Sequence, residues 1–149
     1  LKCGGENTLN SYNDVVPESH ISFFNNASLY KLIDNKLFVH AGIDFGVPIE
    51  KQGPETFLWD RELYREAIAQ FNAGINESLT PYEETYIGHS PIHRHGHVTP
   101  IHSGDVWLMD TGAGWEGGTL SMMDIDSKEC YISDVVSTLY PVGSGRQRF

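Results

Sequence analysis

Two short apolar segments of this sequence end in the same way, with a histidine beside small residues. Residues 36–39 lead into a His-Ala-Gly sequence that begins at His40, and residues 85–87 lead into Gly88 and His89. β-Branched and aromatic residues favour strands, and small residues allow a sharp turn afterwards. Each imidazole is therefore expected at the carboxyl end of a strand, where open α/β sheets bind ligands. Taken alone, either histidine is equally well interpreted as an ordinary side chain at a strand end.

The repetition of this arrangement predicts that His40 and His89 converge on one site. Zinc, iron and manganese all accept a pair of imidazoles, but two ligands do not complete a metal site. Carboxylates or an amide must then come from elsewhere.

The rest of the chain alternates between predicted strands and helices, which favours one domain of the α/β (α+β) class. The turn pair Asp34-Asn35 predicts a hairpin. Segments 43–56 and 92–104 are expected to be loops, the second with an exposed hairpin as its alternative, and the tail 138–149 is expected to be loosely held. The predicted elements are helices 17–27 and 61–71, the second with Asp60 as its N-cap, strands 29–33, 36–39, 85–87, 106–109, 119–125 and 129–132, and a short helix or irregular stretch at 8–12.

Composition narrows the classes of partner. The formal net charge of the 149 residues is −10, with no run of lysine or arginine, which argues against nucleic acid and against an anionic membrane surface. No apolar run approaches the roughly 20 residues of a membrane helix. Cys3 and Cys130 form no Cys-x-x-Cys pair, so a reduced cytoplasmic protein is expected, with a disulfide left open. Because the chain starts at Leu1 without leader-like character, it is expected to be part of a longer product.

Arg61 does not suit its place in the predicted helix. With Asp60 as the N-cap, Arg61 would lie in the opening turn, where a cation gains nothing from the helix dipole. A planar guanidinium beside Trp59 would suit a carboxylate or a phosphate oxygen. A surface ion pair with Glu62 or Glu66 is an equally good interpretation.

Five of the seven histidines fall within residues 89–102. In an extended conformation His93, His95 and His97 would point to the same side and could bind a metal ion. Gly96, Pro100 and Gly104 instead favour a loop in which these three histidines and His102 are solvated.

Four short motifs resemble the C-terminal half of a calcineurin-like metallophosphoesterase, and they are most similar to bacterial and phage serine/threonine phosphoprotein phosphatases. Their order and spacing both match that family. The motifs are Leu-Phe-Val-His-Ala-Gly at 37–42, Leu-Trp-Asp-Arg at 58–61, Ile-Gly-His-Ser-Pro at 87–91 and Met-Asp-Thr-Gly-Ala-Gly-Trp at 109–115.

The resemblance implies a role for three residues. His40 and His89 would bind one metal of a dinuclear site, with Ser90 in place of a more usual threonine, and Arg61 would bind phosphate. It implies a pair of divalent metal ions bridged by a hydroxide, with Mn²⁺ as the first choice and Fe or Zn as alternatives. The implied substrate is a phosphoprotein, a dinucleoside polyphosphate or a small phosphate ester. The implied fold is a four-layer α-β-β-α sandwich, of which this chain holds mostly the second half.

The family's other motifs are absent from these 149 residues. Gly-Asp-x-His-Gly, Gly-Asp-x-x-Asp-Arg-Gly and Gly-Asn-His-Glu/Asp supply the remaining ligands and the general-acid histidine, which are expected upstream of Leu1. The chain alone is therefore expected to hydrolyse no phosphate ester. The alternatives are a histidine-rich metal-binding module, which would use the histidines of segment 92–104, and a non-catalytic interaction domain.

Overall fold

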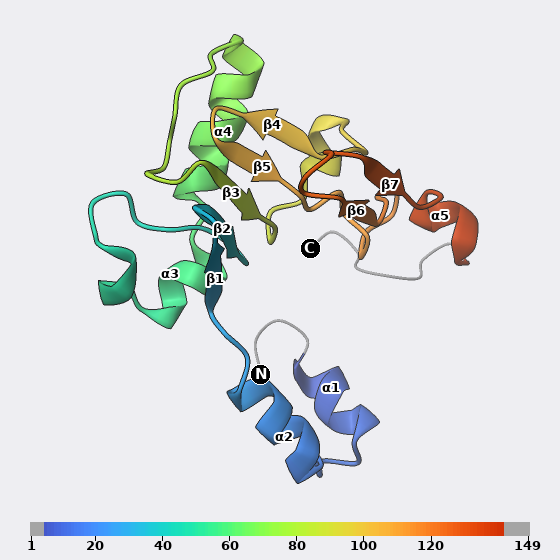
Figure 1. Ribbon diagram of the computed structural model, residues 1–149. Helices are drawn as coiled ribbons and strands as arrows, with labels where there is room; N and C mark the ends of the chain where they lie inside the picture. The colour runs from blue at the N-terminus through green and yellow to red at the C-terminus, as the bar shows by residue number, and fades with distance from the viewer. Residues whose placement is uncertain (1–4, 142–149) are drawn as a thin grey trace.

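A computed structural model describes residues 5–141 of the chain. Its main feature is a mixed five-stranded sheet with the strand order β1-β2-β3-β5-β4 (Figure 1). The elements of the sheet are β1 (Tyr30–Ile33), β2 (Lys36–Val39), β3 (Glu84–Ile87), β4 (Ile101–Ser103) and β5 (Val106–Leu108). The helices are α1 (Gly5–Ser11), α2 (Glu18–Asn25), α3 (Pro54–Trp59), α4 (Glu62–Ala73) and α5 (Val136–Leu139), with 3₁₀ turns at Ile49–Lys51 and Ile92–His95.

The predicted hairpin is confirmed. β1 and β2 pair antiparallel, and the turn residues Asp34 and Asn35 both have positive φ angles, of 47° and 60°. This is the backbone of a two-residue hairpin turn, which aspartate and asparagine tolerate better than most residues.

The centre of the sheet is parallel. β2 pairs parallel with β3, and β3 pairs parallel with β5, so the carboxyl ends of these three strands lie at one edge. The connection from β2 to β3 passes through α3 and α4. His40 and His89 follow directly after β2 and β3 and therefore share that edge.

Segment 92–104 is not simply a loop, so that expectation is wrong in part. It begins with a 3₁₀ turn and ends in β4, which pairs antiparallel with β5. Ile92 and Ile101 are buried, because both belong to the hydrophobic core. Pro100 and Gly104 flank β4 directly, which hid this three-residue strand from the sequence pattern.

The helix expected after an Asp60 N-cap is present as α4, and a short separate helix, α3, precedes it. The chain breaks between α3 and α4 at Asp60 and Arg61, and Arg61 rather than Asp60 occupies the N-cap position. The Asp60 side chain still accepts a hydrogen bond from the backbone N–H of Glu62, at 2.9 Å. The backbone of Arg61 is not helical, but its carbonyl oxygen accepts the first helical hydrogen bond, from the N–H of Arg65 at 3.0 Å.

The core lies between α4 and one face of the sheet (Figure 1). Leu63, Ala67 and Ile68 occupy one side of α4, at helical spacing, and all three are buried. They contribute to the same core as Val106 and Leu108 of β5. Burial of each large aliphatic side chain contributes about 1.5–3 kcal/mol, so this layer fixes the sheet edge that carries the site.

The terminal elements extend away from this layer. α1 and α2 bury no residue and lie apart from the sheet in Figure 1. The predicted strands 119–125 and 129–132 form a small hairpin of β6 (Ser121–Met123) and β7 (Cys130–Ile132). Residues 142–149 of the expected tail, and Cys3, fall outside the described residues; Cys130 is an exposed thiol. None of the helices within residues 5–141 has the length and apolar character needed to cross a bilayer.

Candidate functional site

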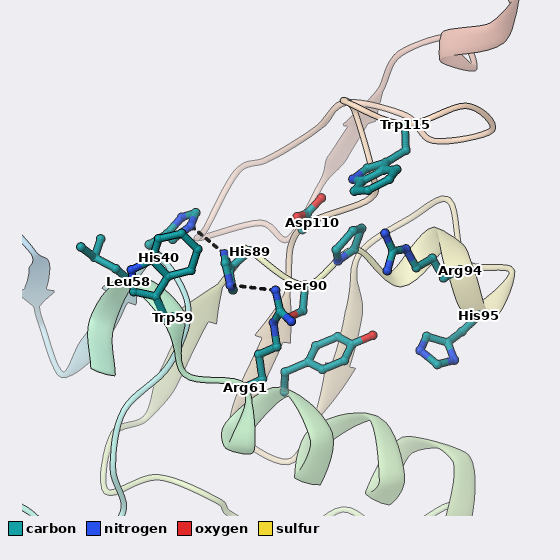
Figure 2. A pocket seen from close by; sticks show the side chains of 12 residues that line it. His40, Leu58, Trp59, Arg61, His89, Ser90, Arg94, His95, Asp110 and Trp115 are labelled. Carbon is teal, nitrogen blue, oxygen red and sulfur yellow. Dashed lines mark hydrogen bonds between the residues drawn. The ribbon is translucent and has the colours of Figure 1, made fainter. Parts of the chain in front are cut away.

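His40 and His89 meet at the edge of the sheet, as their positions after parallel strands predicted. Nε2 of His40 lies 3.1 Å from Nδ1 of His89, and the ring centroids are 4.9 Å apart (Figure 2). The backbone N–H of Gly88 donates to the carbonyl oxygen of His40 at 2.9 Å, which ties the two strand ends together. A β-carbon at Gly88 would lie 3.4 Å from that same oxygen, in ordinary van der Waals contact.

His89 has a backbone conformation that a histidine seldom adopts. Its φ angle is 62°, in the left-handed region, where the β-carbon crowds the following carbonyl group at a cost of about 1–2 kcal/mol. Strained residues of this kind concentrate at functional sites, where the geometry of a side chain matters more than local stability. The sequence pattern located the histidine but gave no sign of the strain.

Arg61 lies beside the histidine pair. Its guanidinium donates to Nε2 of His89 at 3.2 Å. Two contacts bring it there: the backbone N–H of Ala41 bonds to the carbonyl oxygen of Phe57, and Gly42 packs so closely on Asp60 that a β-carbon would lie 2.9 Å from Oδ1. Neither Glu62 nor Glu66 forms an ion pair with Arg61 in the described structure, so the surface-ion-pair interpretation is not supported.

The spacing of the two imidazole nitrogens fits a shared metal ion. Metal–nitrogen bonds of about 2.0–2.1 Å at tetrahedral or octahedral angles place two ligand nitrogens about 2.9–3.4 Å apart. The observed 3.1 Å lies within that range. Within residues 5–141 no third cysteine, histidine or carboxylate joins the pair to make a complete metal cluster. The described residues thus provide two imidazole nitrogens at this position and no third candidate ligand beside them.

The pair and Arg61 line one cavity of about 680 Å³, whose remaining wall the sequence did not predict. Its volume lies in the range typical of small-molecule sites. Figure 2 shows the histidine pair on one side and Arg94, with Trp115 above it, on the other. The lining residues are His40, Leu58, Trp59, Arg61, Tyr64, His89, Ser90, Pro91, Arg94, His95, Asp110 and Trp115.

Aromatic side chains form much of the wall of this cavity. Trp59 contacts the edge of His89, with ring centroids 5.5 Å apart. The pKa of the Tyr64 hydroxyl is raised, mainly by burial. The positive charges of Arg94 and Arg61 act against that rise and the negative charge of Asp110 adds to it, so three charged groups lie near the ring. No periodicity in the sequence connects these residues, which come from separate elements.

Ser90 follows the strained histidine and lies at the floor of the cavity. It is 7 % exposed, and its Oγ is buried without a hydrogen-bond partner among the described residues. A buried hydroxyl without a partner costs about 1–3 kcal/mol. Other atoms of Ser90 line the cavity, whereas the Oγ itself is shielded from it.

The other histidines do not form a cluster in the described structure. The extended alternative, with three imidazoles on one side, is not found, because residues 92–95 form a 3₁₀ turn. His93 stacks on Trp115, whereas His97 contacts Phe71 edge-on at 5.4 Å. His102 is exposed on β4 and stacks on Trp107 at 4.3 Å. His95 is exposed and reaches the edge of the cavity.

Comparison of the sequence with protein-family models and with curated proteins found no match. The function of the site is therefore argued from its chemistry.

Proposed function

We propose that this chain is the C-terminal part of a metal-dependent phosphoester hydrolase, in which His40 and His89 bind one divalent metal ion and Arg61 binds the phosphate. The observation that carries the proposal is the pair of imidazole nitrogens 3.1 Å apart at the ends of adjacent parallel strands, with a guanidinium beside them. In this proposal the five-stranded sheet is one of the two sheets of a four-layer α-β-β-α sandwich. The cofactor is a dinuclear centre, with Mn²⁺ first and Fe or Zn as alternatives.

The residues of the site have separable tasks in this proposal. His40 and His89 would hold the ion through Nε2 and Nδ1, the atoms that already face each other. When bound, the divalent ions supply the nucleophile from water and neutralise charge on the phosphoryl group. Arg61 would donate a pair of hydrogen bonds to phosphate oxygens, since a guanidinium matches their geometry.

The hydrogen bonds of His89 imply that metal binding frees one N–H of Arg61. A guanidinium only donates, so Nε2 of a neutral His89 accepts from Arg61 and the ring proton is on Nδ1. Binding a metal through Nδ1 requires that nitrogen without its proton, and the neutral ring then carries its proton on Nε2. Nε2 can then no longer accept from Arg61, so the one N–H that it holds joins the other four of the guanidinium, which can bind phosphate with or without metal.

Calorimetric titration of the 149-residue chain with Zn²⁺ tests the ligand assignment. Zn²⁺ is the probe because imidazole sites bind it more tightly than Mn²⁺. His40→Ala and His89→Ala should each weaken binding at least tenfold. A His95→Gln/His97→Gln double variant should bind as the wild type does.

The opposite pattern would favour the histidine-rich metal-binding alternative: loss of Zn²⁺ binding in the double variant, and retention after His40→Ala. The chain alone should not hydrolyse p-nitrophenyl phosphate with Mn²⁺, because it lacks the other ligand motifs. Metal-dependent hydrolysis by the purified chain that disappears in His89→Ala would show that these residues suffice.

A further inference from the structure

Arg94 is the second guanidinium of the cavity, and it is held in place without a carboxylate. Its Cζ lies 4.4 Å from the ring centroid of Trp115, so the planar group is stacked on an aromatic face. Stacking of this kind contributes about 0.5–1 kcal/mol at exposed sites and leaves the N–H edge open. Within residues 5–141 no carboxylate lies within ion-pair distance of Arg94.

Trp115 is itself fixed by close packing. His93 stacks on Trp115, and His93 in turn lies against Gly112, where an added β-carbon would come within 2.3 Å of its Nδ1. Arg94 therefore rests on a layer of rings rather than extending freely into solvent. A pre-positioned donor loses less entropy when it binds an anion.

The cavity is locally cationic in an acidic protein. The whole chain has a formal charge of −10, yet Arg61 and Arg94 face a single carboxylate in the cavity, that of Asp110. One oxygen of Asp110 accepts a hydrogen bond from the backbone N–H of Gly112 at 2.9 Å, which offsets part of its charge. Arg61 and Arg94 both act on Tyr64, which lines the same cavity, because the positive charge of each lowers the pKa of the Tyr64 hydroxyl against the effect of burial.

We propose that Arg94 forms a second anion-binding position, so that the site prefers small phosphate compounds that carry a second anionic group, such as bisphosphates. The inference rests on the proposed role of Arg61 as the first phosphate-binding group. Arg61 and Arg94 approach the cavity from different elements, the N-cap of α4 and the 3₁₀ turn at Ile92–His95. A ligand with one phosphate can satisfy one of them, and a ligand with two can satisfy both.

The test is a ³¹P NMR titration of the 149-residue chain in metal-free buffer, because diphosphonates chelate divalent ions. The probes are methylphosphonate and a series of straight-chain alkylene diphosphonates, from methylene to hexylene, which sample the span between the two positions. The wild type should bind at least one diphosphonate roughly tenfold more tightly than methylphosphonate, as expected for an added charge-assisted hydrogen bond.

Variants assign that preference to Arg94. Arg94→Met should reduce the ratio of diphosphonate to methylphosphonate affinity to about one, and Arg94→Lys should recover part of it. Arg65→Met removes an equal charge from an exposed position of α4 outside the cavity, and should leave the preference intact. Arg61→Met should weaken both kinds of probe.

The inference is overturned if no diphosphonate is preferred, or if the preference survives Arg94→Met or is lost in Arg65→Met. The proposed phosphate-binding role of Arg61 fails separately, if Arg61→Met leaves methylphosphonate binding unchanged. The metal-ligand assignment is independent of both results, since it depends on the Zn²⁺ titration.

Discussion

Two regions of this molecule each hold two cationic side chains, and they differ in whether a carboxylate forms ion pairs with those cations. On the sheet face away from α4, Lys36 and Lys128 each approach Glu84 to 2.6 Å, and Tyr86 donates to the same carboxylate at 3.0 Å. We call these four residues the lysine network. In the cavity, the two arginines form no ion pair with any carboxylate among the described residues.

The difference separates structural charge from charge available to a ligand. The lysine network joins β2 and β3 to the loop that precedes β7, and both of its cations are paired with the carboxylate of Glu84. In the cavity neither cation has a carboxylate partner among the described residues: Arg94 lies over the ring of Trp115, and Arg61 donates a hydrogen bond to His89. Changes in the lysine network should therefore alter folding, whereas changes of the arginines should alter binding.

The largest loss of stability is expected where packing supports the cavity, at Gly112. Gly112→Ala should lower the free energy of unfolding by about 3 kcal/mol. The φ angle of 88° costs about 1 kcal/mol, and the clash with His93 adds about 2 kcal/mol. Urea denaturation measures the change.

Gly117→Ala is the matched control for this prediction. Gly117 has a φ angle of 80°, and a β-carbon there meets no atom within 4 Å, so only the backbone cost of about 1 kcal/mol applies. Equal losses in the two variants would show that the contact between Gly112 and His93 does not support the cavity wall.

The next largest loss is expected at the centre of the lysine network. Glu84→Gln keeps the shape but removes the carboxylate charge, and should cost about 2 kcal/mol because two lysines lose their partner. Glu83→Gln is the control, since Glu83 is exposed and lies 3.8 Å from Lys36, and it should cost less than about 0.5 kcal/mol. Denaturation midpoints that agree for the two variants would contradict the structural role of Glu84.

Glu84 should also make stability depend on pH. Burial raises the pKa of its carboxyl, but hydrogen bonds from Lys128, Lys36 and Tyr86 outweigh that effect and lower the pKa from 4.5 to about 2. A lowered pKa in the folded state contributes stability above pH 4.5 that is lost as the pH falls toward 2. The difference in stability between wild type and Glu84→Gln should shrink over that range, and a constant difference would refute this.

The smallest effect on stability is expected at His89. His89→Gly removes ring contacts but also relieves the left-handed strain, so the free energy of unfolding should change by less than about 1 kcal/mol while Zn²⁺ binding is lost. His40→Gly is the control, because His40 does not have a left-handed backbone conformation. It should lower the free energy of unfolding more than His89→Gly does, since no backbone strain is relieved. A large destabilisation of His89→Gly alone would place His89 among the structural residues.

The sequence predicted the parts of the fold that follow local rules. The hairpin around Asp34 and Asn35 and the three central strands were found because turn chemistry and β-branched or aromatic composition are local. β4 was missed because three residues between a proline and a glycine give no periodic signal. The start of α4 was predicted one residue early, with Asp60 as the N-cap, and α3 was missed because its six residues give too short a periodic signal.

The candidate site shows the same difference between local sequence signals, which can be predicted, and tertiary contacts, which cannot. The sequence placed His40, His89 and Arg61 together through repeated strand ends, an ill-placed cation and a family resemblance. It did not identify Arg94 and Trp115 as a pair, since they are 21 positions apart in the chain and meet only through stacking. An arginine among histidines and a tryptophan after a glycine-rich turn were visible, but nothing in their spacing connected them.

The central claim, that His40 and His89 bind one metal ion through the atoms that face each other, is tested most directly by ¹⁵N NMR of the histidine-labelled chain. In the metal-free chain, Nε2 of His89 should be the unprotonated nitrogen. On addition of Zn²⁺, Nε2 of His40 and Nδ1 of His89 should both take the shifts of metal-bound nitrogen, while His95 and His97 stay unchanged. Metal-induced shifts confined to His93, His95 and His97 would contradict the claim.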